Sequence, residues 1–310
     1  MAVRHLVSLD DLTDQDLRAI VARGADLSAG RSAPGGALDG LVAGIYFRRT
    51  STRTRTAFSS GALRLGARIV TFDGGDLQTN TGETSEDTGR VFSRMLDVLV
   101  ARTADDPAEL RAWAGQSRMS VVNAMTADEH PTQGLTDLTT LARHFGRIEG
   151  LRVLYVGEGN NTAAALALGL SRFPGTVLEL RTPEGYGLRE DVYRRARANA
   201  AAHGAVVVER HDPTDPPSDV DVIYTSRWQT TGTSKPDADW RERFTPFRVT
   251  EALWRGSPKA IFMHDLPAHR GEEVSAEVLD GDRSIAFDQA ENKMHSAMAV
   301  LEWCRGGVRT

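Results

Sequence analysis

Short apolar runs rich in β-branched residues alternate along this chain with longer segments of helical character. The runs expected to form strands are 42–47, 67–72, 98–101, 120–123, 152–156, 177–180, 206–208, 222–224 and 260–263. Strands that alternate with helical segments are typical of parallel sheets covered by helices on both faces. The pattern therefore predicts an α/β protein with doubly wound parallel sheets.

The predicted domain break falls between Leu135 and Gly150. Residues 136–145 have the pattern of an amphipathic helix, and residues 146–150 carry glycines that suit a turn before the next strand. A chain of 310 residues is long enough for two domains of ordinary size. No internal repeat and no low-complexity tract interrupts this organisation.

Composition narrows the class of protein. The chain has a formal net charge of −5, which argues against a general nucleic-acid binder. No uncharged apolar stretch is long enough to span a membrane, and residues 1–18 lack the pattern of a signal peptide, so we expect a cytoplasmic protein. The single cysteine, Cys304, excludes an intramolecular disulfide, and without clustered histidines we expect no metal and no other cofactor.

Hydroxyl and guanidinium groups are concentrated just after the first predicted strand, where a helix would begin. Ser51, Thr52 and Thr54 supply hydroxyl donors, and Arg53 and Arg55 supply charged forks. Free backbone N–H groups and the helix dipole favour an anion such as phosphate at this place. The same composition also suits an ordinary capped helix start with solvated charges, so the segment alone does not decide between the two.

Three further motifs occur in order along the chain. They are His130-Pro131-Thr132-Gln133, His264-Asp265-Leu266-Pro267 and the segment 288–295. Together with Ser-Thr-Arg-Thr-Arg at 51–55, they resemble the aspartate and ornithine carbamoyltransferase family, and the segment 288–295 is closest to the ornithine branch. The resemblance covers nearly the whole chain. It implies a carbamoyl-phosphate domain over 1–140, to which a C-terminal helix at about 292–310 returns, and an acceptor domain over 141–291.

By this resemblance, the residues that bind carbamoyl phosphate are Ser51, Thr52, Arg53, Thr54, Gln78, Arg102, His130, Gln133 and Lys293. Of these, Arg53, Arg102, His130 and Gln133 would be catalytic. Arg102 would reach the phosphate and the carbonyl oxygen, His130 would donate to the developing oxyanion, and Gln133 would receive the carbamoyl NH2 group. Arg55 would either support the residues that touch the phosphate or have a structural role.

Two of the positions implied for the donor site, Gln78 and Lys293, need separate comment. Gln78 matches a residue that reaches into the site of a neighbouring subunit, which would make the enzyme a homotrimer or a multiple of trimers; a solvated loop glutamine is the alternative. Lys293 stands where the ornithine branch usually has arginine, and it lacks the bidentate fork.

The glycine-containing segment 157–162 follows a predicted strand and invites a dinucleotide-binding interpretation. Thr162 replaces the third glycine of that motif, and no acidic residue is suitably placed to bind a ribose. The resemblance instead makes Asn160 and Asn161 acceptor ligands. The other acceptor-binding residues that it implies are Ser226, Thr230, Thr231, Asp265 and Leu266.

The acceptor positions differ in type from those of the ornithine branch. Ser226 stands in place of a carboxylate, and Asp265 stands in place of a cysteine. A carboxylate beside the reacting amine would raise the pKa of that amine, so we expect Asp265 to bind a second amino group of the acceptor. Glu129 replaces an apolar or aromatic residue, and it could be solvated, act on His130 or face the acceptor.

The sequence therefore predicts a carbamoyltransferase that moves the carbamoyl group of carbamoyl phosphate to a small amine such as a diamino acid. We expect an acceptor other than ornithine, for example 2,3-diaminopropionate in specialised metabolism, which would become a ureido product. The alternatives are a divergent ornithine carbamoyltransferase, a catalytically silent paralogue that acts as a binding or regulatory subunit, and a nucleotide-dependent oxidoreductase. We expect no nucleic acid or membrane as a partner.

Overall fold

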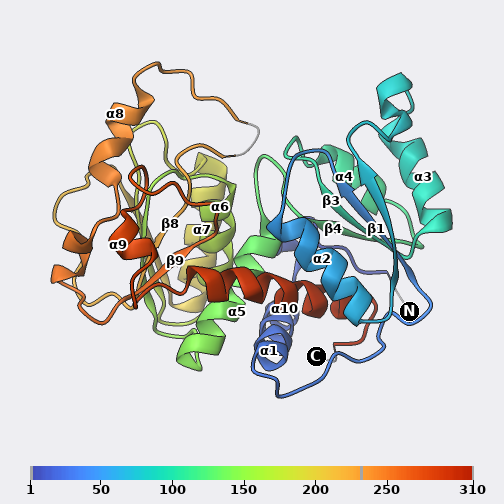
Figure 1. The fold of residues 1–310 in the computed structure, drawn as a ribbon, viewed down its shortest axis with the longest axis horizontal. Helices are drawn as coiled ribbons and strands as arrows, with labels where there is room; N and C mark the ends of the chain where they lie inside the picture. The colour runs from blue at the N-terminus through green and yellow to red at the C-terminus, as the bar shows by residue number, and fades with distance from the viewer. Residues whose placement is uncertain (1–2, 231–232, 309–310) are drawn as a thin grey trace. The chain divides into compact units, whose positions relative to one another are not determined.

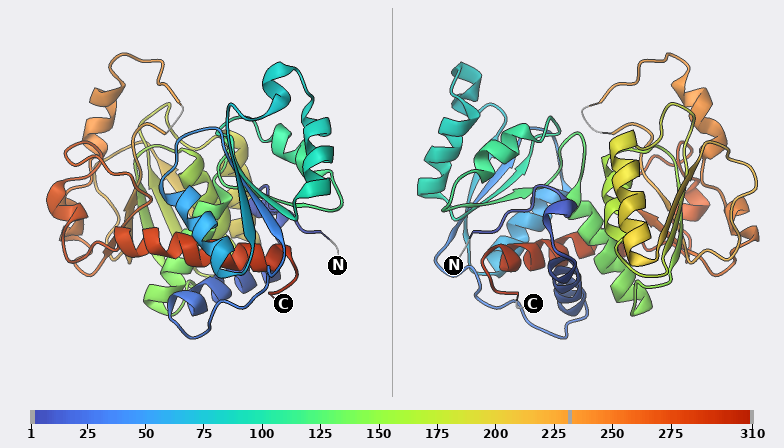
Figure 2. Two further views of the ribbon diagram at one scale, coloured as in Figure 1. Left: turned by 45° about the vertical axis from the view of Figure 1, so that its right-hand side comes forward. Right: turned by 180° about the vertical axis from the view of Figure 1, so that it is seen from behind.

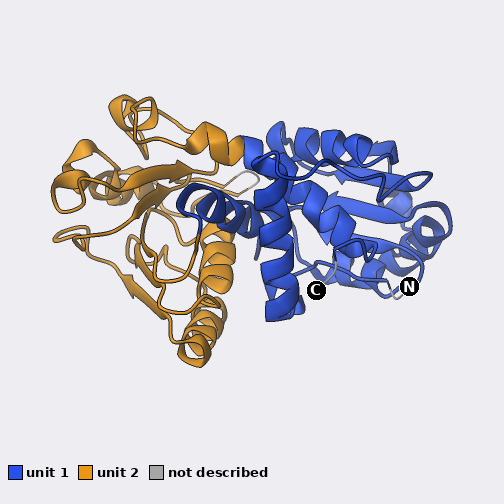
Figure 3. Cartoon of the chain, turned by 90° about the horizontal axis from the view of Figure 1, so that it is seen from below, with its two compact units in different colours: residues 1–146, 291–310 blue, residues 147–290 orange. Residues whose placement is uncertain are grey.

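A computed structural model describes residues 3–230 and 233–308 of the chain. The chain divides into two compact units, residues 1–146 with 291–310 and residues 147–290 (Figure 3). The sequence placed this boundary at 140, six residues earlier. Among the described helices, none combines the length and the apolar character that a membrane span requires.

Unit 1 is built around a parallel sheet with the strand order β2-β1-β3-β4 (Figure 1). Its strands are β1 (Val42–Phe47), β2 (Arg68–Asp73), β3 (Val98–Arg102) and β4 (Ser120–Asn123). Its helices are α1 (Asp14–Ser28), α2 (Arg53–Arg64), α3 (Ser85–Met95), α4 (Ala108–Ala114) and α5 (Pro131–Phe145), with the 3-10 helices η1 (Leu9–Asp11) and η2 (Gln78–Thr81).

The last helix of the chain, α10 (Ala286–Cys304), begins in unit 2 and continues into unit 1. It starts six residues before the predicted position.

Helices cover both faces of the unit 1 sheet, as the alternating pattern predicted. Figure 2 shows α3 and α4 on one face and α2 on the other. The core beneath α3 and α4 is aromatic, since the ring centroids of Tyr46 and Phe92 lie 5.8 and 6.1 Å from that of Trp113. These buried rings hold β1 and β3 in place, so the loops that leave the two strands start from a rigid base.

Unit 2 contains the second parallel sheet, with the order β7-β6-β5-β8-β9. Its strands are β5 (Arg152–Val156), β6 (Val177–Arg181), β7 (Val206–Arg210), β8 (Val222–Thr225) and β9 (Ile261–His264). Its helices are α6 (Asn161–Leu170), α7 (Glu190–His203), α8 (Trp240–Phe244) and α9 (Ala276–Leu279), with η3 (Thr245–Phe247) and η4 (Glu251–Arg255).

The faces of the unit 2 sheet are covered by different kinds of segment. α6 and α7 lie on one face (Figure 2), and every residue of α6 is buried because its sequence is almost entirely Ala, Leu and Gly. The other face packs against the short helices η4 and α9 through Trp254, Phe262 and Val278. Apolar side chains thus enclose β5 and β8 on both faces, which explains why these strands read as continuous hydrophobic runs.

Candidate active-site residues

In unit 1 the candidate residues gather where the strand order reverses. The chain leaves β1 for β2 on one side and later returns to β3 on the other, which makes the carboxyl ends of β1 and β3 the expected place for a ligand. Phe47 pairs with Arg102 at these ends, and the N–H of Arg48 donates to the carbonyl of Arg102 at 2.9 Å. The segment after β1 and the buried Arg102 are therefore neighbours.

The predicted anion loop leads directly into α2. Thr52 is the N-cap residue, but its side chain makes no capping bond, whereas the N-cap side chains of Thr13 and Thr84 accept one from the helices they begin. The Thr52 hydroxyl and the first N–H groups of α2 are thus not used to cap this helix. Thr54 is buried and Ser51 is half-buried, so the loop offers donors at several depths.

Two arginines of this segment bind carboxylates of unit 1. Arg48 donates to Asp105 at 2.9 Å and to Glu109 at 2.8 Å. Arg55 donates to Asp73, and its guanidinium carbon lies 5.2 Å from the centre of the Phe47 ring. These contacts give Arg48 and Arg55 partners within unit 1, and the role of Arg55 stays a prediction.

His130 is the N-cap residue of α5 and is almost fully buried. Its Nδ1 lies 3.2 Å from the hydroxyl of Thr132. Burial lowers the pKa of His130 well below its usual value, and the positive charges of Lys293 and Arg102 lower it further. The imidazole is therefore neutral near pH 7, with one N–H available as a hydrogen-bond donor.

Gln133 is held by two charged side chains. Its Nε2 donates to Asp137 at 2.6 Å, and its Oε1 accepts from the ammonium of Lys293. The structure therefore brings Lys293, expected at the phosphate, against the amide of Gln133. Thr54, Thr132 and Lys293 also line a cavity of about 10 Å³, barely the size of one water molecule, so α2, α5 and α10 pack closely here.

Glu129 has a contact that none of the sequence interpretations named. Its carboxylate is buried and accepts from the hydroxyl of Ser8 at 2.6 Å and from the N–H of Leu9 at 2.8 Å. The solvated interpretation is therefore wrong, and the residue joins η1 to the start of α5. Gln78, by contrast, is exposed in this single chain, and its Oε1 accepts from Thr81 at 2.8 Å.

In unit 2 the candidate acceptor residues also lie where the strand order reverses, here between β5 and β8. Asn160 and Asn161 follow β5, Ser226 and Thr230 follow β8, and Asp265 follows β9 directly. The three strands are neighbours, so their carboxyl ends bring these side chains to one edge of the sheet. Thr231 lies outside the described residues.

Asn160 and Ser226 share a partly buried polar network. Oδ1 of Asn160 caps α6 by accepting from the N–H groups of Thr162 and Ala163 at 3.0 and 3.1 Å. Its Nδ2 donates to the hydroxyl of Ser226 at 2.9 Å, and that hydroxyl lies 2.6 Å from the hydroxyl of Tyr155. Both side chains, expected as acceptor ligands, thus have protein partners in this structure. Asn161 is buried at the first position of α6.

Asp265 and Leu266 form a bend supported by buried side chains. Oδ2 of Asp265 accepts from the hydroxyl of Thr162 at 2.9 Å. The N–H of Leu266, a residue with a φ of 52°, donates to Nδ1 of His264 at 2.8 Å. Nδ1 therefore accepts, and Nε2 of His264 faces Glu273 at 3.2 Å. The neighbouring His264 thereby fixes the backbone that carries Asp265.

Glu158 and Lys235 are residues of this edge that the sequence interpretation missed. Oε1 of Glu158 binds the ammonium of Lys235, and its Oε2 lies 3.5 Å from the hydroxyl of Thr230. Burial raises the pKa of Glu158 above its usual value, although Lys235 acts in the opposite direction. The only signal in the sequence was a lysine in a chain that has very few.

Gly159 is required by the close approach of another backbone segment. A Cβ at this position would lie 2.2 Å from the carbonyl carbon of Gly187 and 2.2 Å from the nitrogen of Leu188. The N–H of Gly159 donates to the carbonyl of Tyr186 at 2.8 Å. Protein backbone thus occupies the side of the loop that a pyrophosphate would need, which argues against dinucleotide binding.

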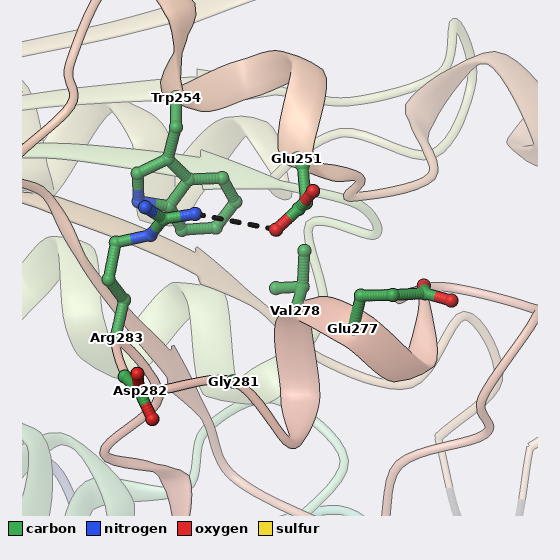
Figure 4. A pocket seen from close by; sticks show the side chains of 7 residues that line it. All are labelled: Glu251, Trp254, Glu277, Val278, Gly281, Asp282 and Arg283. Carbon is green, nitrogen blue, oxygen red and sulfur yellow. Dashed lines mark ion pairs between the residues drawn. The ribbon is translucent and has the colours of Figure 1, made fainter.

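Two other features of unit 2 lie apart from the candidate residues. A surface cavity of about 320 Å³ lies beside η4 and α9 (Figure 4), where the guanidinium of Arg283 covers the ring of Trp254 and pairs with Glu251 at 3.6 Å. His269, Glu272 and Glu273 could hold a metal ion, since they bring ligand atoms within 4.8 Å of one another. One carboxylate oxygen of Glu273 already accepts from the backbone N–H of His269 at 2.5 Å. The expected absence of a metal is not tested by these contacts and stays a prediction.

Two family models match the chain. The aspartate/ornithine carbamoyltransferase carbamoyl-P binding domain matches residues 4–143, and the Asp/Orn binding domain of the same family matches residues 149–304. Together they cover almost all of both units.

Individual relatives agree with these matches. The chain is 37% identical to the ornithine carbamoyltransferase of Thermococcus kodakarensis, over 100% of this chain and 98% of the relative. It is 39% identical to that of Symbiobacterium thermophilum, over 96% of each chain. The solved structure of the Pyrococcus furiosus ornithine carbamoyltransferase has a TM-score of 0.91 at 36% identity, with 99% of each chain covered.

Proposed function

The chain belongs to the aspartate/ornithine carbamoyltransferase family, and on that premise we propose that it transfers the carbamoyl group of carbamoyl phosphate to a primary amine of a diamino acid. The observation that carries the proposal is the carboxyl edge of unit 1. There the N-terminus of α2, with a Thr52 hydroxyl not used for capping, begins beside the strand end that carries Arg102. Such a place suits a phosphate group.

We assign the donor-binding roles accordingly. Ser51, Thr52, Arg53 and Thr54 bind the phosphate, and Arg102 binds the phosphate and the carbonyl oxygen. The neutral His130 donates its N–H to that oxygen as it becomes negative, and Gln133 receives the carbamoyl NH2 group through Oε1. Lys293 and Asp137 fix the orientation of the Gln133 amide, which supports this role for Oε1.

The reaction needs few groups from the protein. The lone pair of the acceptor amine attacks the carbonyl carbon of carbamoyl phosphate, and a tetrahedral intermediate with a negative oxygen forms. The bond between that carbon and the phosphate oxygen then breaks, and the leaving phosphate takes one proton from the attacking nitrogen, which gives inorganic phosphate and a ureido product. Positioned donors at the carbonyl oxygen stabilise the intermediate, with an effect of roughly 3 kcal/mol for a single donor.

The first candidate acceptor is L-ornithine. The relatives that match over nearly the full length carry the name ornithine carbamoyltransferase, and no comparison supports a different acceptor. The second candidate is a shorter diamino acid such as 2,3-diaminopropionate. It is favoured by one observation, the neutral hydroxyl of Ser226 and the carboxylate of Asp265 at the acceptor edge. On this proposal Asn160, Asn161, Thr230 and Leu266 complete the acceptor contacts.

We further propose a cytoplasmic enzyme that assembles as a homotrimer or a multiple of trimers. The exposed position of Gln78 in a polar loop supports this assembly, because such a side chain is accessible to a neighbouring subunit. Light scattering on the purified chain tests the assembly. A monomer or dimer at micromolar concentration would remove the proposed role of Gln78.

A screen for phosphate release tests the activity. The enzyme is incubated with carbamoyl phosphate and one amine at a time, including L-ornithine, L-2,3-diaminopropionate, L-2,4-diaminobutyrate and L-lysine, and the ureido product is identified by mass spectrometry. A kcat/KM near 10⁵ M⁻¹s⁻¹ in order of magnitude with ornithine identifies an ordinary ornithine carbamoyltransferase. No product with any amine would favour the silent paralogue.

A further inference from the structure

The ammonium of Lys235 sits in a cage of three aromatic rings. Its Nζ lies 4.7 Å from the ring centre of Tyr186, 5.4 Å from that of Trp240 and 4.7 Å from that of Phe244, and the side chain is only 3% exposed. The carboxylate of Glu158 supplies the counter-charge. A lysine is almost never buried this completely without such partners, so the cage is a specific arrangement.

The cage is assembled from segments on both sides of Lys235. Tyr186 comes from the loop after β6, and its hydroxyl donates to Asp237 at 2.7 Å. Phe244 packs against Trp228, with ring centres 5.6 Å apart, and Trp228 lies just beyond the end of β8. The cage thus ties residues 226–230 and 233–240 to the rest of unit 2.

Side-chain contacts matter here because regular structure is missing. Between Thr225 and Trp240 the described residues form no helix and no strand. The position of such a segment depends on the few contacts that hold it, in contrast to a strand that neighbours hold by a ladder of backbone hydrogen bonds.

A single carboxylate connects the two loops that carry the acceptor residues. Glu158 belongs to the loop after β5 and lies two residues before Asn160. Its Oε1 binds Lys235, and its Oε2 lies 3.5 Å from the hydroxyl of Thr230. One side chain therefore contacts the loop after β8 at two points, Thr230 and Lys235.

We propose that Glu158 and Lys235 are positioning residues that set acceptor selectivity. The caged ion pair fixes the segment after β8 relative to the Asn160 loop, so that the acceptor contacts have a defined spacing. Neither residue touches the reacting atoms. This inference rests on the proposed function and deepens it, because it names residues that determine which amine the edge accepts.

The variant Lys235→Met removes the ammonium and keeps much of the apolar volume in the cage. With L-ornithine and L-2,3-diaminopropionate as probes, we expect the KM of the better acceptor to rise at least about tenfold, equivalent to about 1.4 kcal/mol. The KM for carbamoyl phosphate and kcat should stay within about twofold. Lys259→Met, which changes an exposed lysine of the same unit, is the matched control and should resemble the wild type.

A second variant separates positioning from general damage. In Lys235→Met the buried Glu158 carboxylate has lost its cation, so the added change Glu158→Gln should recover part of the acceptor KM, by at least about threefold. Recovery in the double variant would not follow from two independent structural losses. If Lys235→Met fails to fold, Glu158→Gln alone should show the same selective rise in acceptor KM.

The outcomes distinguish this inference from the proposed function. An unmodified enzyme that releases no phosphate with any amine would overturn the proposed function, and the inference with it. An active enzyme whose Lys235→Met and Glu158→Gln variants match the Lys259→Met control would overturn the inference alone. An equal rise in the KM for the amine and in the KM for carbamoyl phosphate would also overturn the inference, since it would indicate a purely structural role.

Discussion

The carboxyl edges of the two sheets differ in how their polar groups are used. In unit 1 the edge combines the start of α2 with Arg102 and the neutral His130, and the Thr52 hydroxyl does not cap its helix. In unit 2 the corresponding edge carries side chains that bind one another: Ser226 with Asn160, and Asp265 with Thr162. Both edges lie where the strand order reverses.

This difference shows which part of a site a sequence reveals. A phosphate group is recognised largely by backbone N–H groups and arginines, so a short motif is enough to propose the place. An acceptor is recognised by a few side chains whose availability depends on their neighbours. Whether Ser226 and Asp265 are available to a ligand at the proposed acceptor edge therefore depends on their partners Tyr155, Asn160 and Thr162.

The largest expected effect concerns the edge of unit 1. Arg53→Ala and His130→Ala should each lower turnover at least about a hundredfold, because each removes a positioned partner of charge in the transition state. Arg53→Ala should also weaken carbamoyl-phosphate binding strongly, whereas His130→Ala should act mainly on kcat. Steady-state kinetics with separate measurement of donor affinity tests this division, with Arg55→Ala as the control. Near-wild-type turnover would remove the proposed donor site.

A smaller effect is expected at the edge of unit 2. The double variant Ser226→Asp with Asp265→Cys should shift the ratio of kcat/KM for L-ornithine over L-2,3-diaminopropionate by about tenfold toward ornithine. The amide of Asn160 can donate to a carboxylate at 226, so it need not be unpaired there, whereas the Tyr155 hydroxyl already donates to the carbonyl of Glu158. Ser234→Asp, on an exposed residue of the same segment, is the control. An unchanged ratio would mean that these two positions do not set the preference.

Lys293→Arg should have a weaker effect still, a loss in kcat/KM of less than tenfold. The guanidinium of the introduced arginine can still donate to Gln133. However, the close packing around position 293 leaves little room for a group larger than the lysine ammonium. Kinetics with varied carbamoyl phosphate measure the change. Tighter donor binding would instead show that the residue at 293 reaches the phosphate, as the sequence comparison with the ornithine branch suggested.

The smallest effect is a pH dependence of stability from His130. The folded state keeps this residue neutral, while the unfolded chain binds a proton near pH 6.5, so acidification through 6.5 favours unfolding. The contribution of His130 to the free energy of unfolding should fall by about 0.7 kcal/mol between pH 7 and pH 6. Denaturant unfolding of the wild type and of His130→Asn measures it. The variant should lose less stability over this range, and a parallel response would mean that His130 is not buried as a neutral imidazole.

The strands and their alternation with helices could be predicted from the sequence pattern. All nine predicted strands are present, most within one or two residues of their predicted ends, because buried parallel strands form unbroken apolar runs. The α/β fold with two parallel sheets is confirmed by the solved structure at a TM-score of 0.91. α5 begins at Pro131, five residues before the amphipathic stretch predicted at 136–145, and it carries Gln133 close to its N-cap residue His130.

The contacts between distant loops could not be predicted from the sequence. Nothing in the sequence links Glu158 to Lys235, or Glu129 to Ser8, because these pairs are separated by long stretches of chain and their meeting depends on how the strands are ordered. Charged residues near a motif were therefore read as ligands or as solvated groups. In the folded chain they are structural links.

The contact of Glu129 with η1 has a practical meaning for the beginning of the chain. Leu6 extends the edge of the unit 1 sheet, since its N–H donates to Val121 at 2.9 Å and its carbonyl accepts from Asn123 at 2.7 Å. A shortened protein that starts after Leu9 would expose the outer strand and leave the Glu129 carboxylate without Ser8, directly beside His130. Removal of this segment would therefore change the surroundings of His130 at the proposed phosphate-binding edge as well as the surface.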